Sequence, residues 1–164
     1  MKKILVAAAA ILGLCGTAHA AQDYYNDGHW IVAGSQVTGG YECAATVVTT
    51  AAGLTVALGQ NANGQAAPAT IGFLDDGKKS HTITVQFAGY APWTLPMQWD
   101  GHRTVFWNPQ PRQFIQFYMQ MMSSTSMSIT SVNGTRVFSL ANKEDALPAL
   151  HRCVANIRTL TGAL

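Results

Sequence analysis

The fold of this chain is decided by residues 133–160, which read NGTRVFSLANKEDALPALHRCVANIRTL. The pair Asn133-Gly134 predicts a two-residue hairpin turn, because Asn and Gly are the residues that most readily adopt the positive φ angles of such a turn. Residues 135–140 predict a short strand, and the residues after a polar corner predict a helix. This stretch therefore predicts a hairpin that leads into a helix lying on the sheet.

The final helix has to accommodate Pro148, because a proline deep inside a helix removes a backbone hydrogen bond. We expect Asp145 to be the N-cap, which places Pro148 at the third helical position, where no intrahelical N–H is lost. An apolar stripe follows at helical spacing. It consists of Leu147, Leu150, Val154, Ile157 and Thr161, flanked by Ala146, Ala149, Cys153 and Leu160. Cys153 is therefore expected at the edge of the face that packs on the sheet.

The N-terminus has the pattern of a bacterial secretory signal peptide. Lys2 and Lys3 are followed by an apolar run over residues 4–14 and by the small residues of Ala18-His19-Ala20. The run is shorter than a membrane-spanning helix, and we expect cleavage after Ala20. The protein is then periplasmic or secreted.

Cleavage there divides the chain into a leader, residues 1–20, and a single exported domain, residues 21–164. Cys15 offers a second possibility, attachment of a lipid, but Leu14 before it is bulkier than such a signal usually allows. The rest of the sequence contains no second long apolar run, so we expect no membrane span after cleavage.

The exported domain carries almost no net charge. Lys2 and Lys3 are two of the ten Lys and Arg residues of the chain, so eight remain against eight Asp and Glu. Binding to nucleic acid depends on clustered Lys and Arg side chains that neutralise phosphates. The sequence therefore predicts no nucleic-acid partner.

Cleavage also leaves two cysteines, Cys43 and Cys153. A single pair in an exported protein predicts one disulfide, which would stabilise a loop of this length by about 4–5 kcal/mol through chain entropy. The alternatives are a redox pair and a thiolate metal site. They are less favoured, because the chain has no Cys-x-x-Cys motif and no nearby cation cluster to lower a thiol pKa.

Alternation of apolar and polar residues predicts most of the strands, and it is clearest over residues 81–87. The other predicted strands are residues 29–33, 41–50, 53–58, 69–74, 93–99, 103–107, 127–132 and 135–140. Residues 21–28 are expected to be a loose lead-in, and residues 59–68 a loop that is the most dispensable part of the domain.

The spacing changes to three and four residues after Pro111, which is favoured at the first position of a helix. The apolar residues of this predicted helix, residues 111–122, are Phe114, Ile115, Tyr118, Met121 and Met122. The predicted fold is a β-dominated α+β domain. It is an antiparallel sheet or sandwich of about nine short strands with two helices, and the C-terminal helix is packed on the sheet and tied to it by the disulfide.

The last third of the chain reads helix, strand, Asn-Gly turn, strand, helix. Its segments are FIQFYM (114–119), MSI (127–129), RVFSL (136–140) and DALPAL (145–150). With the early Trp30 and Cys43, this order resembles small exported bacterial proteins of the invasion-associated locus B type. The resemblance implies a β-rich envelope or host-contact protein without catalytic residues.

Three tryptophans, Trp93, Trp99 and Trp107, fall on either side of the predicted Asp100-Gly101 turn. Tryptophans on a hairpin suit the recognition of sugars, peptides or proteins, because they present a large area with a polar edge. They form a candidate binding face, and the competing interpretation is an ordinary aromatic core.

Catalytic and metal motifs are weak. His29, His81, His102 and His151 lack metal-ligand spacing, and no Gly-x-Ser-x-Gly motif is present, although His102 lies next to Asp100. A methionine cluster suits Cu(I), which binds thioether sulfur, but it also suits the apolar face of a helix. The cluster is Met97, Met119, Met121, Met122 and Met127.

We therefore expect an exported, non-catalytic binding or interaction module without a cofactor. Its partner would be a protein or a small molecule. The alternative is a periplasmic hydrolase or a protein that handles copper or another metal.

Overall fold

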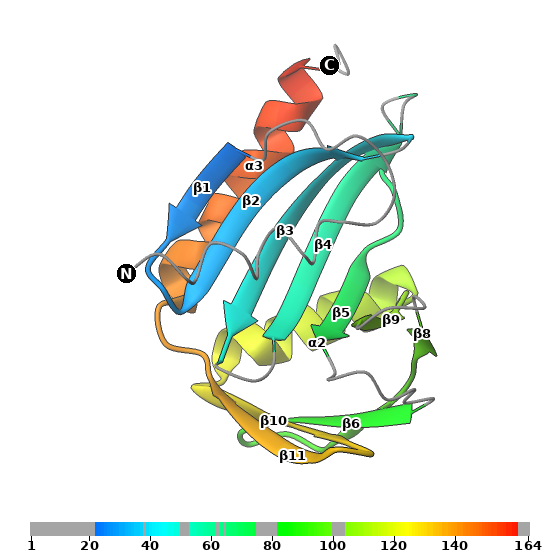
Figure 1. The fold of residues 1–164 in the computed structure, drawn as a ribbon, viewed down its shortest axis with the longest axis vertical. Coiled ribbons are helices and arrows are strands. Elements are labelled where there is room, and N and C mark those ends of the chain that lie inside the picture. The colour runs from blue at the N-terminus through cyan, green and yellow to red at the C-terminus, as the bar shows by residue number, and fades with distance from the viewer. Residues whose placement is uncertain are drawn as a thin grey trace.

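The computed structural model describes residues 22–37, 39–49, 53–61, 63, 65–74, 82–99 and 104–160. Within these residues, eleven strands form two antiparallel sheets and two helices lie against them (Figure 1). The predicted fold class, β-dominated and antiparallel with two helices, is confirmed.

The larger sheet has seven strands. Their spatial order is β1 (Gln22–Asn26), β2 (Trp30–Val37), β3 (Gly40–Val48), β4 (Gly53–Asn61), β5 (Thr70–Leu74), β9 (Thr104–Trp107) and β8 (Gln98–Trp99). The smaller sheet has the order β11 (Gly134–Ser139), β10 (Ser126–Ser131), β6 (Thr82–Phe87) and β7 (Trp93–Pro96). The helices are α2 (Pro111–Ser123) and α3 (Lys143–Leu160).

The smaller sheet follows the alternation seen in its sequence. Ile83, Val85 and Phe87 of β6 are buried, whereas Thr82 and Gln86 are exposed. Each strand thus buries one apolar face and leaves the other to water. The sequence predicted this segment correctly because its period of two is uninterrupted.

The predicted strand 93–99 is in fact two strands that belong to different sheets. β7 pairs with β6 in the smaller sheet, and β8 pairs with β9 in the larger one. Pro96 ends the first pairing, since it has no N–H to donate, and Met97 lies between the two strands. The segment therefore carries the chain from one sheet to the other.

Helix α3 lies across β1, β2 and β3, and the predicted disulfide joins it to β3. Cys43 and Cys153 are bonded with a Cα–Cα distance of 6.0 Å, and both are fully buried. Gly34 pairs with Cys43, and a Cβ on it would lie only 2.7 Å from Sγ of Cys153. Glycine at this position therefore lets the helix approach the sheet closely enough for the bond.

The predicted start of the last helix is wrong. The helix begins at Lys143, and the backbone oxygen of Asn142 accepts hydrogen bonds from the N–H groups of Asp145 and Ala146, each at 3.1 Å. Asn142 has a φ of 62°, which asparagine tolerates better than most residues. Pro148 consequently lies inside the helix, at the cost of one backbone hydrogen bond.

Two further expectations are corrected. Residues 21–28 were expected to be a loose lead-in, but Gln22–Asn26 form the edge strand β1, whose mostly polar residues hide the alternation.

In the last hairpin, Ser131 pairs with Gly134, so the turn consists of Val132 and Asn133. Only Gly134 has a positive φ there, at 100°.

Candidate functional site

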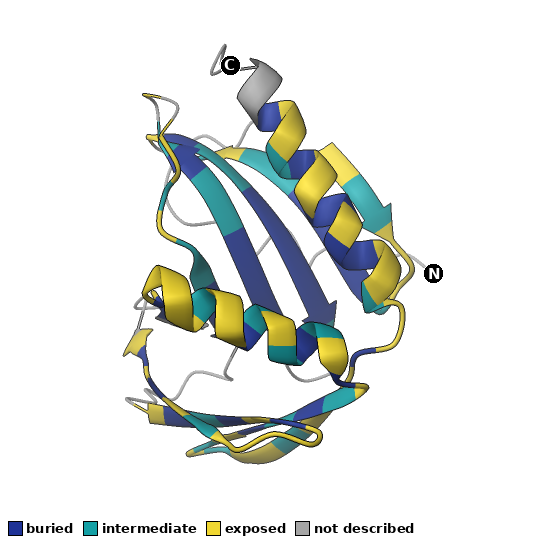
Figure 2. Cartoon of the chain, turned by 180° about the vertical axis from the view of Figure 1, so that it is seen from behind, coloured by how far each residue is buried: buried dark blue, intermediate teal, exposed yellow. Residues whose placement is uncertain are grey.

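Helices α2 and α3 lie on the same face of the larger sheet (Figure 2). Residues of both helices and of the sheet line a groove there. It has a volume of about 710 Å³. Its lining consists of Leu58, Gly59, Gln60, Ala66, Ala67, Pro68, Ala69, Asn108, Pro109, Gln110, Pro111, Phe114, Ile115 and Val154. These residues come from β4, the segment after it, the segment between β9 and α2, the start of α2 and the middle of α3.

The floor of the groove is the far end of β4. Leu54 and Val56 are buried, but Leu58, the next residue on the same face, is only half-buried. Leu58 pairs with Cys43, and Val154 follows Cys153 on α3. The disulfide therefore joins α3, one wall of the groove, to the strand beside its floor.

The α2 wall is anchored by Phe117, which is fully buried. Its ring packs edge-on against those of Phe87, Trp93 and Trp107, with centroids 4.9, 5.9 and 5.8 Å away. Ile115 lies on another side of the helix and lines the groove with 61% of its surface exposed. Because α2 is anchored by Phe117, the apolar side chain of Ile115 stays exposed to solvent at the groove.

Tyr118 and His151 join the two helices. The Tyr118 hydroxyl and Nε2 of His151 are hydrogen-bonded at 3.0 Å, and burial raises the pKa of Tyr118. Tyr118 is one helical turn beyond Phe114, and His151 is almost one turn before Val154. The bond therefore connects the two walls.

The remaining wall comes from Gly59, Gln60 and residues 66–68, part of the segment 59–68 that the sequence predicts to be a dispensable loop. β4 continues to Asn61, and Gln60 forms an isolated bridge with Ala66. The N–H of Asn61 donates to the oxygen of Gln65, and that of Ala67 to the oxygen of Gly59, both at 2.9 Å. The expectation of a loop is wrong in part, because β4 reaches Asn61 and the described residues that follow are hydrogen-bonded back to the end of this strand.

The structure brings together two of the three predicted binding-face tryptophans. The Trp93 and Trp107 ring centroids are 6.1 Å apart, Trp107 is buried, and Trp93 donates from Nε1 to Oε1 of Gln120 at 2.6 Å. Both pack against α2, as the core interpretation expects. The side chain of Trp99 lies outside the described residues, so the binding face as a whole stays a prediction.

The described methionines do not line the groove. Met97, Met121 and Met127 are buried, Met122 is half-buried and Met119 is exposed. His81, His102 and Asp100 lie outside the described residues. Over the residues that are described, no group of three or more His, Cys, Asp or Glu side chains is placed to hold a metal ion.

The sequence pattern assigned no binding role to any residue of the groove, although it predicted Phe114, Ile115 and Val154 as apolar helix residues. The sequence did contain one indication of the groove, because α2 carries more apolar residues than one buried helix face requires. Phe117 and Met121 are buried, but Ile115 and Met119 are exposed on the same helix. Apolar residues around most of a surface helix indicate a second contact.

No family model, curated protein or solved structure matches this chain. The resemblance to invasion-associated locus B proteins stays a prediction. Of the helices that the structure describes, none has the length and apolarity needed to cross a membrane.

Proposed function

We propose that this protein is an exported, disulfide-stapled binding module and that it takes a small apolar ligand into the groove between α2 and α3. The N-terminal leader pattern supports export, and the buried bond between Cys43 and Cys153 suits an oxidising compartment.

The chemistry of the groove is the observation that carries the proposal. Its volume of about 710 Å³ is in the range of small-molecule sites, and its described lining is mainly Leu, Ala, Pro, Phe, Ile and Val. The polar side chains among these lining residues are the amides of Gln60, Asn108 and Gln110. This lining offers contact area rather than a nucleophile or a titrating group, which favours binding over catalysis.

Titration of the purified, oxidised protein with N-phenyl-1-naphthylamine, a neutral dye that fluoresces in apolar surroundings, tests the proposal. We expect saturable binding of one dye per chain with a dissociation constant on the order of micromolar, as for a compact apolar ligand.

Two exposed side chains of α2 give a matched pair of variants. Ile115 lines the groove and Met119, one turn further on, does not, although 61% and 58% of their surfaces are exposed. Ile115→Gln should weaken dye binding about fivefold, since it removes roughly 1 kcal/mol of apolar contact. Met119→Gln should leave it unchanged. Non-saturable binding, or equal effects of the two variants, would refute the proposed site.

A further inference from the structure

We infer that the groove selects uncharged ligands and excludes an anionic ligand of the same shape. The inference rests on the proposed function, because it specifies the ligand class of that site. It follows from what the groove presents at its centre and from what lies at its rim.

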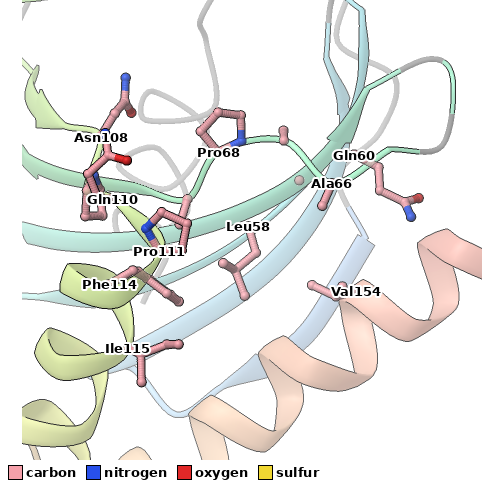
Figure 3. A pocket seen from close by; sticks show the side chains of 14 residues that line it. Leu58, Gln60, Ala66, Pro68, Asn108, Gln110, Pro111, Phe114, Ile115 and Val154 are labelled. Carbon is pink, nitrogen blue, oxygen red and sulfur yellow. The ribbon is translucent and has the colours of Figure 1, made fainter.

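Apolar side chains alone meet at the centre of the groove. Figure 3 shows Leu58, Phe114 and Ile115 close together, with Val154 facing them from α3. The amide of Asn108 points away from this centre, and its Oδ1 accepts a hydrogen bond from Oγ1 of Thr70 at 2.9 Å. A ligand that fills the centre therefore loses its contacts with water and gains contacts with apolar side chains only.

Charged partners are missing from the described lining. Arg112 on α2 and Arg152 on α3 are exposed, and neither lines the groove. A charge buried without a partner is strongly unfavourable, because it loses its hydration and gains nothing in return. An anionic ligand must either leave its charged group in water or bind more weakly than its neutral counterpart.

The N-terminus of α2 is the feature that could favour an anion, because a helix dipole is positive at that end. This terminus offers few donors. Pro111 has no N–H, and the N–H of Phe114 already donates to the backbone oxygen of Gln110 at 2.9 Å. The dipole at this terminus is therefore a weak substitute for a charged partner.

Two dyes with the same aromatic body provide the test. N-Phenyl-1-naphthylamine is neutral, and 8-anilino-1-naphthalenesulfonate adds one sulfonate to the same skeleton. We expect the neutral dye to bind the wild-type protein at least about tenfold more tightly. Competition between the dyes, followed by fluorescence, reports whether they share the site.

A charge placed in the lining should reverse the preference. Ile115→Lys puts an ammonium group at the wall, so the sulfonate dye should gain at least about tenfold in affinity while the neutral dye loses affinity. Met119→Lys is the matched control and should change neither dye substantially. Ile115→Lys should also fold normally, because Ile115 is largely exposed; the thermal transition of each variant checks this.

The outcomes separate the two claims. If neither dye binds saturably, the proposed function fails and the inference fails with it. If the sulfonate dye binds the wild-type protein as tightly as the neutral dye, and both respond to Ile115→Gln but not to Met119→Gln, the groove is a ligand site but its selectivity is not the one inferred.

Discussion

At the scale of single residues, the carboxylate of Asp27 connects distant parts of the chain through hydrogen bonds. It accepts hydrogen bonds from the N–H groups of His29 (2.8 Å) and Trp30 (2.6 Å), from the Tyr25 hydroxyl (3.1 Å) and from the Asn142 side chain (2.7 Å). Burial raises the pKa of Asp27, but the hydrogen bonds outweigh it and lower the pKa from 3.8 to about 2. The turn between β1 and β2 is thereby fixed to the start of α3.

This shift predicts how stability depends on pH. Because the folded pKa of Asp27 lies below the unfolded one, its contribution is complete above about pH 4 and is lost as the pH falls toward 2. Asp27→Asn should lower the free energy of unfolding by about 1 kcal/mol at pH 7 and flatten the melting temperature between pH 4 and 2.

Melting curves recorded across this pH range check the prediction. Asp23→Asn is the control, since Asp23 is an exposed carboxylate on β1, the strand that precedes Asp27. A pH dependence that is equally steep in wild-type protein and Asp27→Asn would show that other carboxylates are responsible.

At the scale of elements, α3 is positioned by both packing and a covalent bond. Six buried residues of α3 pack on the sheet, and none of them lines the groove. They are Ala146, Leu147, Ala149, Leu150, Cys153 and Ile157. The disulfide adds a constraint that acts mainly on the unfolded chain, because it closes a loop with a sequence separation of 110.

Replacing both cysteines separates stability from binding. Cys43→Ala with Cys153→Ala should lower the free energy of unfolding by about 2–5 kcal/mol. Well below its lowered melting temperature, the variant should still bind the neutral dye with unchanged affinity, because packing alone keeps α3 on the sheet. Denaturant unfolding and dye titration of the same sample measure both quantities. Lost binding without lost stability would mean that the cysteines act in function.

Prediction from the sequence was correct where a local pattern sufficed. The alternation of β6, the helical spacing of α2 and the cysteine pair all predicted the correct structure. It failed at the start of α3, where the left-handed Asn142 sets the first turn, and at β1, where an edge strand needs no alternation. These features depend on contacts with distant residues, which no local window contains.

At the scale of the whole molecule, the groove exists because two helices cover only part of one sheet face. The aromatic packing of Phe117 anchors α2, and the buried residues of α3 anchor that helix on the sheet, so Leu58 remains between the helices with incomplete cover. No spacing in the sequence predicted this, since the angle between the helices follows from both anchors together. The ligand site is thus a product of the assembled fold rather than of any one element.

A nuclear magnetic resonance titration of the isotopically labelled, oxidised protein with N-phenyl-1-naphthylamine tests this account most directly. We predict that the amide signals that shift most belong to Leu58, Ala66, Ala67, Ile115 and Val154, and that they share one dissociation constant. These residues line the groove from β4, the segment after it, α2 and α3. Shifts centred instead on the smaller sheet, or on β8 and β9 around Trp99, would contradict the assignment of the groove as the ligand site.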